Sequence, residues 1–204
     1  MKLIGMLDSP YVRRTAIALK LLGIPFEHLP LSVFSTFDAF RALNPVVKAP
    51  TLILDDGQVL MDSSLILDYA QHCLGAKRSL LPDTTPERVT ALRHIGLALA
   101  ACEKTVQIVY ERNLRPIEKQ HEPLMARFRG QLLDAYTALE HDGMATAENG
   151  DESSIGLSGV SVAVAWRFTQ LMLPEIVRCE DFPKLRQFSA WAEELPVFLS
   201  TPIV

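Results

Sequence analysis

The chain has 204 residues, of which 49% are hydrophobic and 22% charged, and its formal net charge is -4 at pH 7. This apolar content supplies a real core and excludes wholesale disorder. Lys and Arg are scattered along the chain, which argues against a nucleic-acid partner, because phosphate binding needs a concentrated basic face. No apolar stretch reaches the roughly 18 residues that span a bilayer, and the first apolar run is too short for a signal peptide.

The three cysteines are odd in number and widely spaced, at Cys73, Cys102 and Cys179. They form no CxxC pair and no metal-ligand spacing, so we expect reduced thiols and no metal. We therefore expect the protein to be cytoplasmic.

Residues 1–78 alternate in character and predict an α/β module of order β-α-β-α-β-β-α. Apolar residues recur at helical spacing from Val12 until Gly23 ends the run. Asp56-Gly57 between two apolar runs is a strong hairpin signal. The expected strands are residues 3–7, 26–31 and the two arms of 51–61, and the expected helices are residues 12–22, 36–43 and 63–74.

Residues 79–86, with two prolines and several turn formers, predict a linker. From residue 87 to residue 204 most of the chain is helical in pattern, which predicts a second, all-α module. Its expected helices are residues 88–112, 123–141, 160–173 and 183–194, with a polar loop at residues 143–156 and a buried central helix at 160–173.

The stretch "DSPYVRR" places Ser9 and Pro10 where the first helix begins. Ser9 or Asp8 as the N-cap, with Pro10 at the first helical position, is the ordinary structural interpretation. The functional interpretation uses the same geometry, because a helix start favours an anion. The Ser9 hydroxyl could there donate to a bound thiolate, whose pKa falls at a helix N-terminus.

Two further stretches likewise allow both a structural and a functional interpretation. In "NPVVKAPTL", Ala49-Pro50 directly precedes a strand. A trans bond is the common case, whereas a cis bond would leave the Ala49 backbone free to pair with an extended peptide. Lys48 beside it could reach a carboxylate. In "MDSSLI", Asp62 and Ser63 form an ordinary helix start that could also hold an ammonium and a carboxylate.

Taken in order, these stretches describe one peptide site for a thiol, an extended backbone, a carboxylate and an amino-acid head group. Glutathione has those four features. At this point the chain resembles the cytosolic glutathione S-transferases, of the bacterial type with a serine at the first helix. "SPYVRR", "NPVVKAP" and "DSSLILDY" are similar to the family's S-P-[FY]-V-R-[KR], N-P-x-x-K-V-P and [ED]-S-x-x-I-x-x-Y segments.

The resemblance implies a thioredoxin-like domain, an all-α domain, a homodimer, a role in detoxification, and glutathione as the co-substrate. Carried over by position, Ser9 would polarise the glutathione sulfur, and Ala49 beside a cis Pro50 would pair with the cysteinyl backbone. Asp62 and Ser63 would hold the γ-glutamyl end, and Lys48 could contact the glycyl carboxylate.

The second substrate, a small hydrophobic electrophile, is expected in a pocket between the two domains, lined by the long helix that starts at Arg88. The candidates are Tyr11, Cys102, Val106 and Tyr110, although core packing explains such a stripe equally well. A non-catalytic binding or regulatory protein remains an alternative, as does a glutathione-dependent peroxidase, isomerase or dehalogenase.

The chain departs from the family pattern in three places. Ser161 stands where an aspartate often completes the capping of the buried helix, although Ser158 could still cap it. The loop "AENGDESS" is long and polar. Leu195-Pro196 replaces the usual Arg-Pro.

Overall fold

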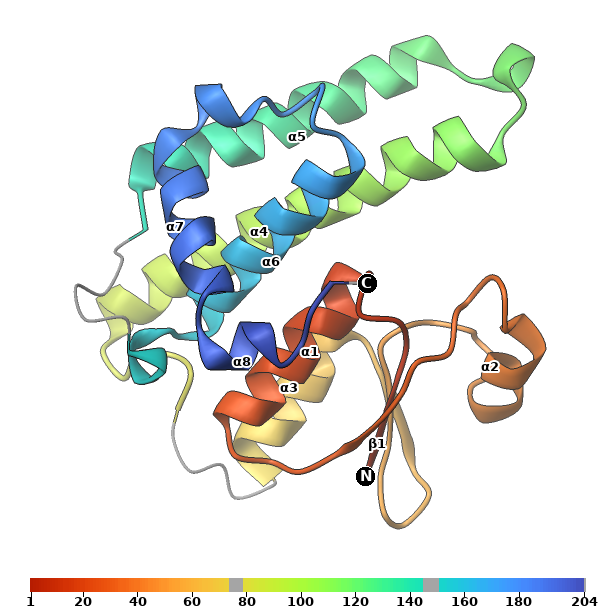
Figure 1. Ribbon diagram of the computed structural model, residues 1–204, viewed down its shortest axis with the longest axis vertical. Helices are drawn as coiled ribbons and strands as arrows, with labels where there is room; N and C mark the ends of the chain where they lie inside the picture. The colour runs from red at the N-terminus through yellow and green to blue at the C-terminus, as the bar shows by residue number, and fades with distance from the viewer. Residues whose placement is uncertain (74–78, 145–150, 204) are drawn as a thin grey trace. The chain divides into compact units, whose positions relative to one another are not determined.

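A computed structural model of the chain describes residues 1–73, 79–144 and 151–203 (Figure 1). The described residues form two compact units. Unit 1 comprises Met1–Leu81 together with Leu195–Val204, and unit 2 comprises Pro82–Glu194.

Unit 1 is built on a four-stranded mixed sheet of order β2-β1-β3-β4. Strand β1 pairs in parallel with β2 and antiparallel with β3, which pairs antiparallel with β4. The central position of β1 explains its apolar residues: Leu3 and Ile4 are fully buried. The strands are β1 (Lys2–Ile4), β2 (Glu27–Leu29), β3 (Thr51–Ile53) and β4 (Val59–Met61).

Three helices accompany this sheet: α1 (Pro10–Leu21), α2 (Phe37–Leu43) and α3 (Ser63–Cys73). Helices α1 and α3 pack against each other (Figure 1). Val12, Ala16 and Leu19 recur at helical spacing on α1 and are buried, as the periodicity predicts. The predicted α/β order and the hairpin around Asp56-Gly57 are therefore confirmed, while the predicted residue 74 lies outside the described part of the chain.

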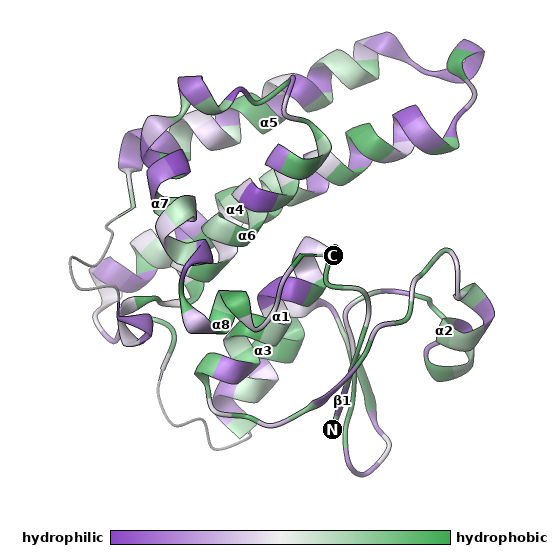
Figure 2. Ribbon diagram, in the orientation of Figure 1, coloured by the Kyte–Doolittle hydropathy of each residue, from purple (hydrophilic) through white to green (hydrophobic). Residues whose placement is uncertain are grey.

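The stretch Leu195–Val204 belongs to unit 1 and contains the short helix α8 (Pro196–Leu199). Figure 2 shows α8 as largely hydrophobic, and it packs on α1. Arg13 of α1 is 1% exposed, and its Nε donates to the carbonyl oxygen of Thr201 at 2.8 Å. Its guanidinium also lies 5.5 Å from the centre of the Phe198 ring.

This placement differs from the expected helical module that runs from residue 87 to residue 204. The difference has a physical cause, because a buried guanidinium needs an acceptor and the carbonyl of Thr201 supplies one.

Unit 2 is helical, with α4 (Thr85–Leu114), α5 (Glu122–Asp142), α6 (Leu157–Met172) and α7 (Pro183–Glu193). Short 3-10 turns lie at Ile117–Lys119, Glu152–Ser154 and Cys179–Asp181. Helix α6 contacts α4 and α7, and the residues along most of its length are buried, as predicted. None of the helices in the described ranges combines the length and the apolarity that a membrane crossing requires.

Hydrogen bonds between polar side chains connect the helices in the core of unit 2. The Tyr136 hydroxyl on α5 donates to the carbonyl oxygen of Ala165 at 2.9 Å, and its oxygen lies 2.7 Å from Thr169 Oγ1, within hydrogen-bond distance. Thr105 Oγ1 on α4 lies 2.8 Å from the same Thr169 oxygen. These bonds tie three helices together and satisfy hydroxyl groups that would otherwise be costly to bury.

The start of α6 differs from the prediction. The helix begins at Leu157 with Gly156 as its N-cap, and no side chain caps it. The expectation that Ser158 caps this helix is therefore wrong, because Ser158 lies inside the first turn. The Ser161 hydroxyl donates to the carbonyl oxygen of Leu157 at 2.7 Å.

Candidate functional site

The first component of the site is the start of α1. Ser9 is the N-cap, with extended backbone angles, and Pro10 occupies the first turn. Ser9 Oγ accepts a hydrogen bond from the amide of Val12 at 3.5 Å, which is long for such a bond. The predicted cap is confirmed. The weak cap bond leaves the half-buried hydroxyl able to interact with a ligand at a helix end that favours negative charge.

The second component is the loop between α2 and β3. The peptide bond between Ala49 and Pro50 is cis. Asn44 anchors the loop from within: its Nδ2 donates to Thr51 Oγ1 at 2.8 Å, and its Oδ1 accepts from the amide of Val46 at 3.0 Å. Thr51 Oγ1 in turn donates to the carbonyl oxygen of Lys48 at 2.7 Å. Side-chain bonds from both flanks therefore fix the backbone around Ala49.

Gly5 brings these two components together. A Cβ atom added at Gly5 would lie 2.5 Å from Val12 Cγ2 and 3.2 Å from Ala49 Cβ. The residue also has a φ of +137°, which an L side chain rarely adopts. The close approach places Val12 of α1 and Ala49 together beside the α-carbon of Gly5. His28 Nε2 contacts the Gly5 carbonyl oxygen at 2.8 Å.

The third component is the start of α3. Asp62 has a φ of +75°, and its Oδ1 accepts from the amide of Ser64 at 2.9 Å. Its Oδ2 lies 3.6 Å from Lys48 Nζ, so the loop and the helix start are adjacent. The structure thus brings Lys48, Ala49, Asp62 and the first turn of α1 to one end of unit 1.

This group also includes a buried arginine, which the sequence pattern did not single out. Arg14 on α1 is 2% exposed, and its Nη1 donates to Ser63 Oγ at 2.8 Å and to Ser64 Oγ at 3.4 Å. By helical periodicity, an arginine is assigned to the polar surface of a helix. The only sequence signal for the burial of Arg14 was therefore its position within an otherwise buried helix. The bond links α1 directly to the start of α3.

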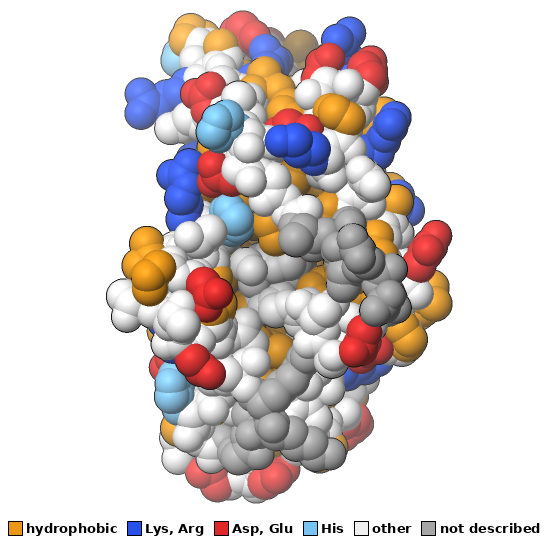
Figure 3. All heavy atoms as spheres, turned by 90° about the vertical axis from the view of Figure 1, so that its left-hand side faces the viewer, with side chains coloured by type: hydrophobic (Ala, Val, Ile, Leu, Met, Phe, Trp, Pro, Cys, Tyr) orange, Lys and Arg blue, Asp and Glu red, His pale blue; other side chains and the backbone are white. Residues whose placement is uncertain are grey.

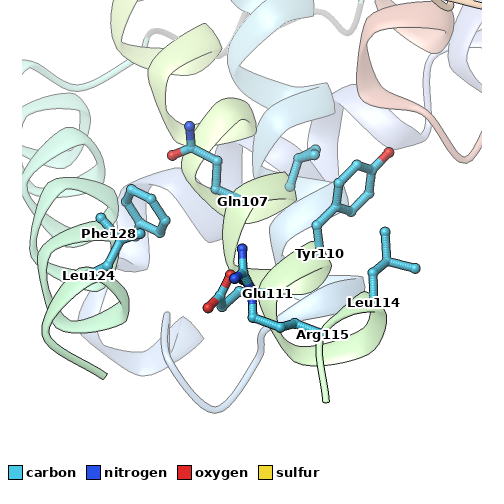
Figure 4. Close-up of a pocket in the computed structure, with 8 residues that line it drawn as sticks. Gln107, Tyr110, Glu111, Leu114, Arg115, Leu124 and Phe128 are labelled. Carbon is cyan, nitrogen blue, oxygen red and sulfur yellow. Dashed lines mark ion pairs between the residues drawn. The ribbon is translucent and has the colours of Figure 1, made fainter. Parts of the chain in front are cut away.

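Two of the four expected acceptor residues share a pocket. Val106 and Tyr110 line a pocket of about 480 Å³ in unit 2, between α4 and α5 (Figure 4). Cys102 is buried instead and interacts with Tyr136, whose pKa is raised well above its usual value by burial and by the Cys102 charge. Tyr11 belongs to α1 in unit 1. The pocket lining is completed by Gln107, Glu111, Leu114, Arg115, Leu124 and Phe128.

The pocket combines apolar and charged groups. Leu124 and Phe128 project from α5, opposite Gln107 and Glu111 of α4 (Figure 4). Glu111 Oε2 lies 2.9 Å from Arg115 Nε, and Glu111 Oε1 accepts from the amide of His121 at 3.0 Å. A pocket with this lining can bind an apolar molecule that carries a polar group.

Within the described ranges, no group of three or more His, Cys, Asp or Glu side chains could hold a metal ion. The three cysteines are free thiols, as predicted. On the face drawn in Figure 3, basic and acidic side chains are interspersed.

Comparison with known proteins shows which family part of this chain resembles. Residues 3–76 match the family model described as glutathione S-transferase, N-terminal domain. Glutathione S-transferase U4 of Arabidopsis thaliana is 32% identical over 118 residues, which is 52% of this chain and 52% of that protein. The chain thus spans about half the length of this plant relative. The uncharacterized GST-like protein YibF of Escherichia coli (strain K12) is 25% identical over 91% of this chain and 90% of its own length.

A solved structure extends the likeness over nearly the whole chain. A glutathione transferase family member from Pseudomonas fluorescens Pf-5, crystallised with bound glutathione, is 29% identical and has a TM-score of 0.82. The match covers 98% of this chain and 97% of that one. The predicted fold class, a thioredoxin-like domain followed by a mostly helical part, is confirmed. Together these comparisons show that residues 3–76 are similar to the glutathione S-transferase N-terminal domain and that the chain shares the fold of solved glutathione transferases.

Proposed function

We propose that this protein is a glutathione transferase of the type with a serine at the first helix, which activates the glutathione thiol for attack on a small hydrophobic electrophile. The observation that carries the proposal is the convergence around Gly5. It brings the Ser9 helix start beside Ala49, and Lys48 then connects the loop to Asp62. The Pseudomonas fluorescens relative, which holds glutathione, supports the same ligand.

In this proposal Ser9 is the catalytic residue. Its hydroxyl donates to the glutathione sulfur and stabilises the thiolate, together with the free amides at the start of α1. The thiol proton leaves to solvent, and the thiolate then forms a bond to the electrophilic carbon of the acceptor. In a substitution the leaving group departs with the electron pair of its bond to that carbon; in an addition to an activated double bond the neighbouring atom takes the electron pair and then a proton from solvent. A serine cannot form the mixed disulfide that a cysteine would form here, which favours conjugation over thiol-disulfide exchange.

The other site residues hold the rest of the tripeptide. The Ala49 backbone, beside Pro50, pairs with the cysteinyl residue in the manner of an added strand. Asp62 and Ser63 take the ammonium and the carboxylate of the γ-glutamyl end. Lys48 takes the glycyl carboxylate.

The acceptor is assigned to the helical part of the protein. Val106 and Tyr110 line the pocket between α4 and α5, and we infer an acceptor with an apolar body from that lining. Tyr11 and Cys102 remain candidates from the sequence pattern. We further infer a cytoplasmic homodimer with a role in detoxification, in keeping with the resemblance.

The proposal is tested by titrating the protein with glutathione in a calorimeter and by assaying a panel of electrophiles and peroxides. Binding at or below millimolar glutathione, with turnover of an electrophile, is expected. Ser9→Ala should lower turnover at least tenfold, while the matched variant of a half-buried serine in unit 2, Ser158→Ala, should not change it.

Each other outcome has a definite meaning. Absence of binding at millimolar glutathione contradicts the proposal as a whole. Binding without any turnover would identify a non-catalytic binding protein. Normal turnover in Ser9→Ala would remove Ser9 from the mechanism, and turnover confined to peroxides, isomerisable substrates or halogenated substrates would redefine the reaction.

A further inference from the structure

We propose that the pocket between α4 and α5 selects an apolar ligand that carries an anionic group, and that Arg115 is the residue that binds this group. The inference deepens the proposed function, and it rests on that function where the ligand is taken to be the acceptor. A carboxylate attached to an aromatic or aliphatic body has the chemistry that the pocket requires.

The apolar part of the pocket is accessible to a ligand. Leu114 is 61% exposed, Tyr110 is 42% exposed and Leu124 is 38% exposed. All three line the cavity of about 480 Å³, and Phe128 adds an aromatic ring from α5 (Figure 4). A ligand that covers these side chains removes their surface from water, which favours the binding of an apolar body.

The carboxylate in the pocket lining, Glu111, is already satisfied by the protein itself. Its side chain is 8% exposed. Glu111 Oε1 accepts from the amide of His121 at 3.0 Å, and Glu111 Oε2 lies 2.9 Å from Arg115 Nε. A buried carboxylate needs such partners. Glu111 therefore holds Arg115 in place and is not the group that the pocket presents to a ligand.

Arg115 uses only part of its guanidinium group in this ion pair. Its side chain is 53% exposed, and neither Nη atom donates a hydrogen bond to an acceptor within residues 1–73, 79–144 and 151–203. A guanidinium carries five N–H donors in a fixed fork that matches the two oxygens of a carboxylate. The Nη donors of Arg115 can therefore bind a ligand carboxylate while Nε remains beside Glu111.

The end of α4 would otherwise disfavour an anion. The helix ends at Leu114, and the unpaired carbonyl oxygens at a helix C-terminus carry partial negative charge. Gln120 Nε2 donates to two of these oxygens, the carbonyl of Arg112 at 3.2 Å and the carbonyl of Arg115 at 3.1 Å. Because these bonds satisfy two of the acceptors, the guanidinium of Arg115 becomes the dominant polar group at this end of the pocket.

The first experiment measures binding without glutathione. The protein is titrated with ω-phenylhexanoate and with ω-phenylhexanamide, and NMR chemical shifts report the two dissociation constants. The wild-type protein should bind the carboxylate about fivefold more tightly than the amide, as expected for an ion pair at a half-exposed arginine. This preference should fall to less than about twofold in about 0.5 M NaCl, because salt screens exposed charges. Arg115→Met should remove the preference by weakening the binding of the carboxylate.

Arg112→Met is the matched control. Arg112 lies three residues earlier on α4, and its Nη1 donates to Glu175 Oε1 at 2.6 Å, outside the pocket lining. This variant should keep the fivefold preference. Because Arg115→Met leaves the buried Glu111 carboxylate unpaired, the double variant Glu111→Gln/Arg115→Met supplies the result if the single variant does not fold. The double variant keeps the net charge and should bind the carboxylate and the amide equally well.

The second experiment uses the proposed reaction. The compound para-(chloromethyl)benzoate and its methyl ester present the same electrophilic carbon to glutathione and differ in charge. Arg115→Met should raise the KM of the benzoate about fivefold while its kcat stays within twofold. The KM of the methyl ester should change less than twofold in the same variant.

The outcomes separate the two proposals. Equal affinity of the wild-type protein for the two titrants, or a preference that survives in Arg115→Met, overturns the role of Arg115. Turnover of both electrophiles with KM values that Arg115→Met does not change also overturns that role and leaves the proposed function standing. A carboxylate preference that depends on Arg115, without turnover of any electrophile, supports the pocket as a site for apolar anions and contradicts the proposed function alone.

Discussion

Lys48 Nζ lies 3.6 Å from Asp62 Oδ2, and both side chains remain substantially exposed, at 54% and 43%. An exposed ion pair of this kind contributes about 0–1 kcal/mol to stability. Both residues therefore remain available to opposite ends of a zwitterionic ligand.

Lys48→Ala should leave the free energy of unfolding nearly unchanged while weakening glutathione binding severalfold. Lys2→Ala is the matched control, since Lys2 Nζ lies 3.7 Å from Glu27 Oε2 in the same unit at similar exposure. Calorimetric titration and urea unfolding of both variants measure the two effects. Equal glutathione affinity in the wild type and Lys48→Ala would contradict the assigned contact.

Asn44 should be important for stability because its side chain is buried and holds two partners. Asn44→Ala removes the bond to Thr51 Oγ1 and the bond from the amide of Val46. The expected loss is about 1–3 kcal/mol of unfolding free energy, with weaker glutathione binding because the Ala49 backbone loses its anchor. Asn44→Asp keeps the acceptor for Val46, so its urea midpoint should lie between those of the wild type and Asn44→Ala.

Gly5→Ala should abolish glutathione binding. The added methyl group would lie 2.5 Å from Val12 Cγ2, at a φ of +137°, so both the backbone and the neighbours must shift. Gly159→Ala is a control of similar steric kind in unit 2, with an added Cβ 2.8 Å from Ile155 Cγ1. Both should lose about 1–3 kcal/mol of stability from overpacking, but Gly159→Ala should keep its affinity. Intact binding in Gly5→Ala would show that the site tolerates movement there.

Tyr136 should make the protein sensitive to alkali. Burial raises the pKa of Tyr136 well above its usual value, so the folded protein retains the phenol proton when the unfolded chain releases it near pH 10. The contribution of Tyr136 to stability is therefore constant below about pH 10 and falls as the pH rises further.

Tyr136→Phe should be about 1–2 kcal/mol less stable at pH 8, because the hydroxyl bonds to Ala165 and Thr169 are lost. It should also lose less stability than the wild type between pH 9 and pH 11. Urea unfolding across this pH range tests both statements, and parallel curves for the two proteins would assign the alkaline transition to another group.

Local signals in the sequence were sufficient to predict much of the secondary structure of unit 1. Apolar periodicity predicted α1, Asp56-Gly57 predicted the hairpin, and Ser9-Pro10 predicted the helix start. These features depend on neighbours within a few residues, which is the range over which periodicity and capping act. The order of Lys48-Ala49-Pro50 and Asp62-Ser63 then predicted a site, although the sequence could not show that they meet.

The features that depend on distant contacts were not predictable. Arg13 and Arg14 are buried because Thr201 and Ser63 accept their hydrogen bonds, and both acceptors come from other parts of the chain. Val47, a β-branched residue, has a φ of +52° that no local rule favours. In each case tertiary structure overrides a local preference.

The return of Leu195–Val204 to unit 1 also affects the order of events on the ribosome. Residues 82–194 must be synthesised between the two stretches that form this unit. At about 5–20 residues per second, that interval is on the order of ten seconds. Throughout it, the α1 surface that later contacts Phe198 has no partner from this segment, and the Arg13 guanidinium lacks the Thr201 carbonyl. A nascent chain would thus expose the helix that Ser9 caps well after that helix has emerged, and this makes α1 a natural place for a chaperone to act.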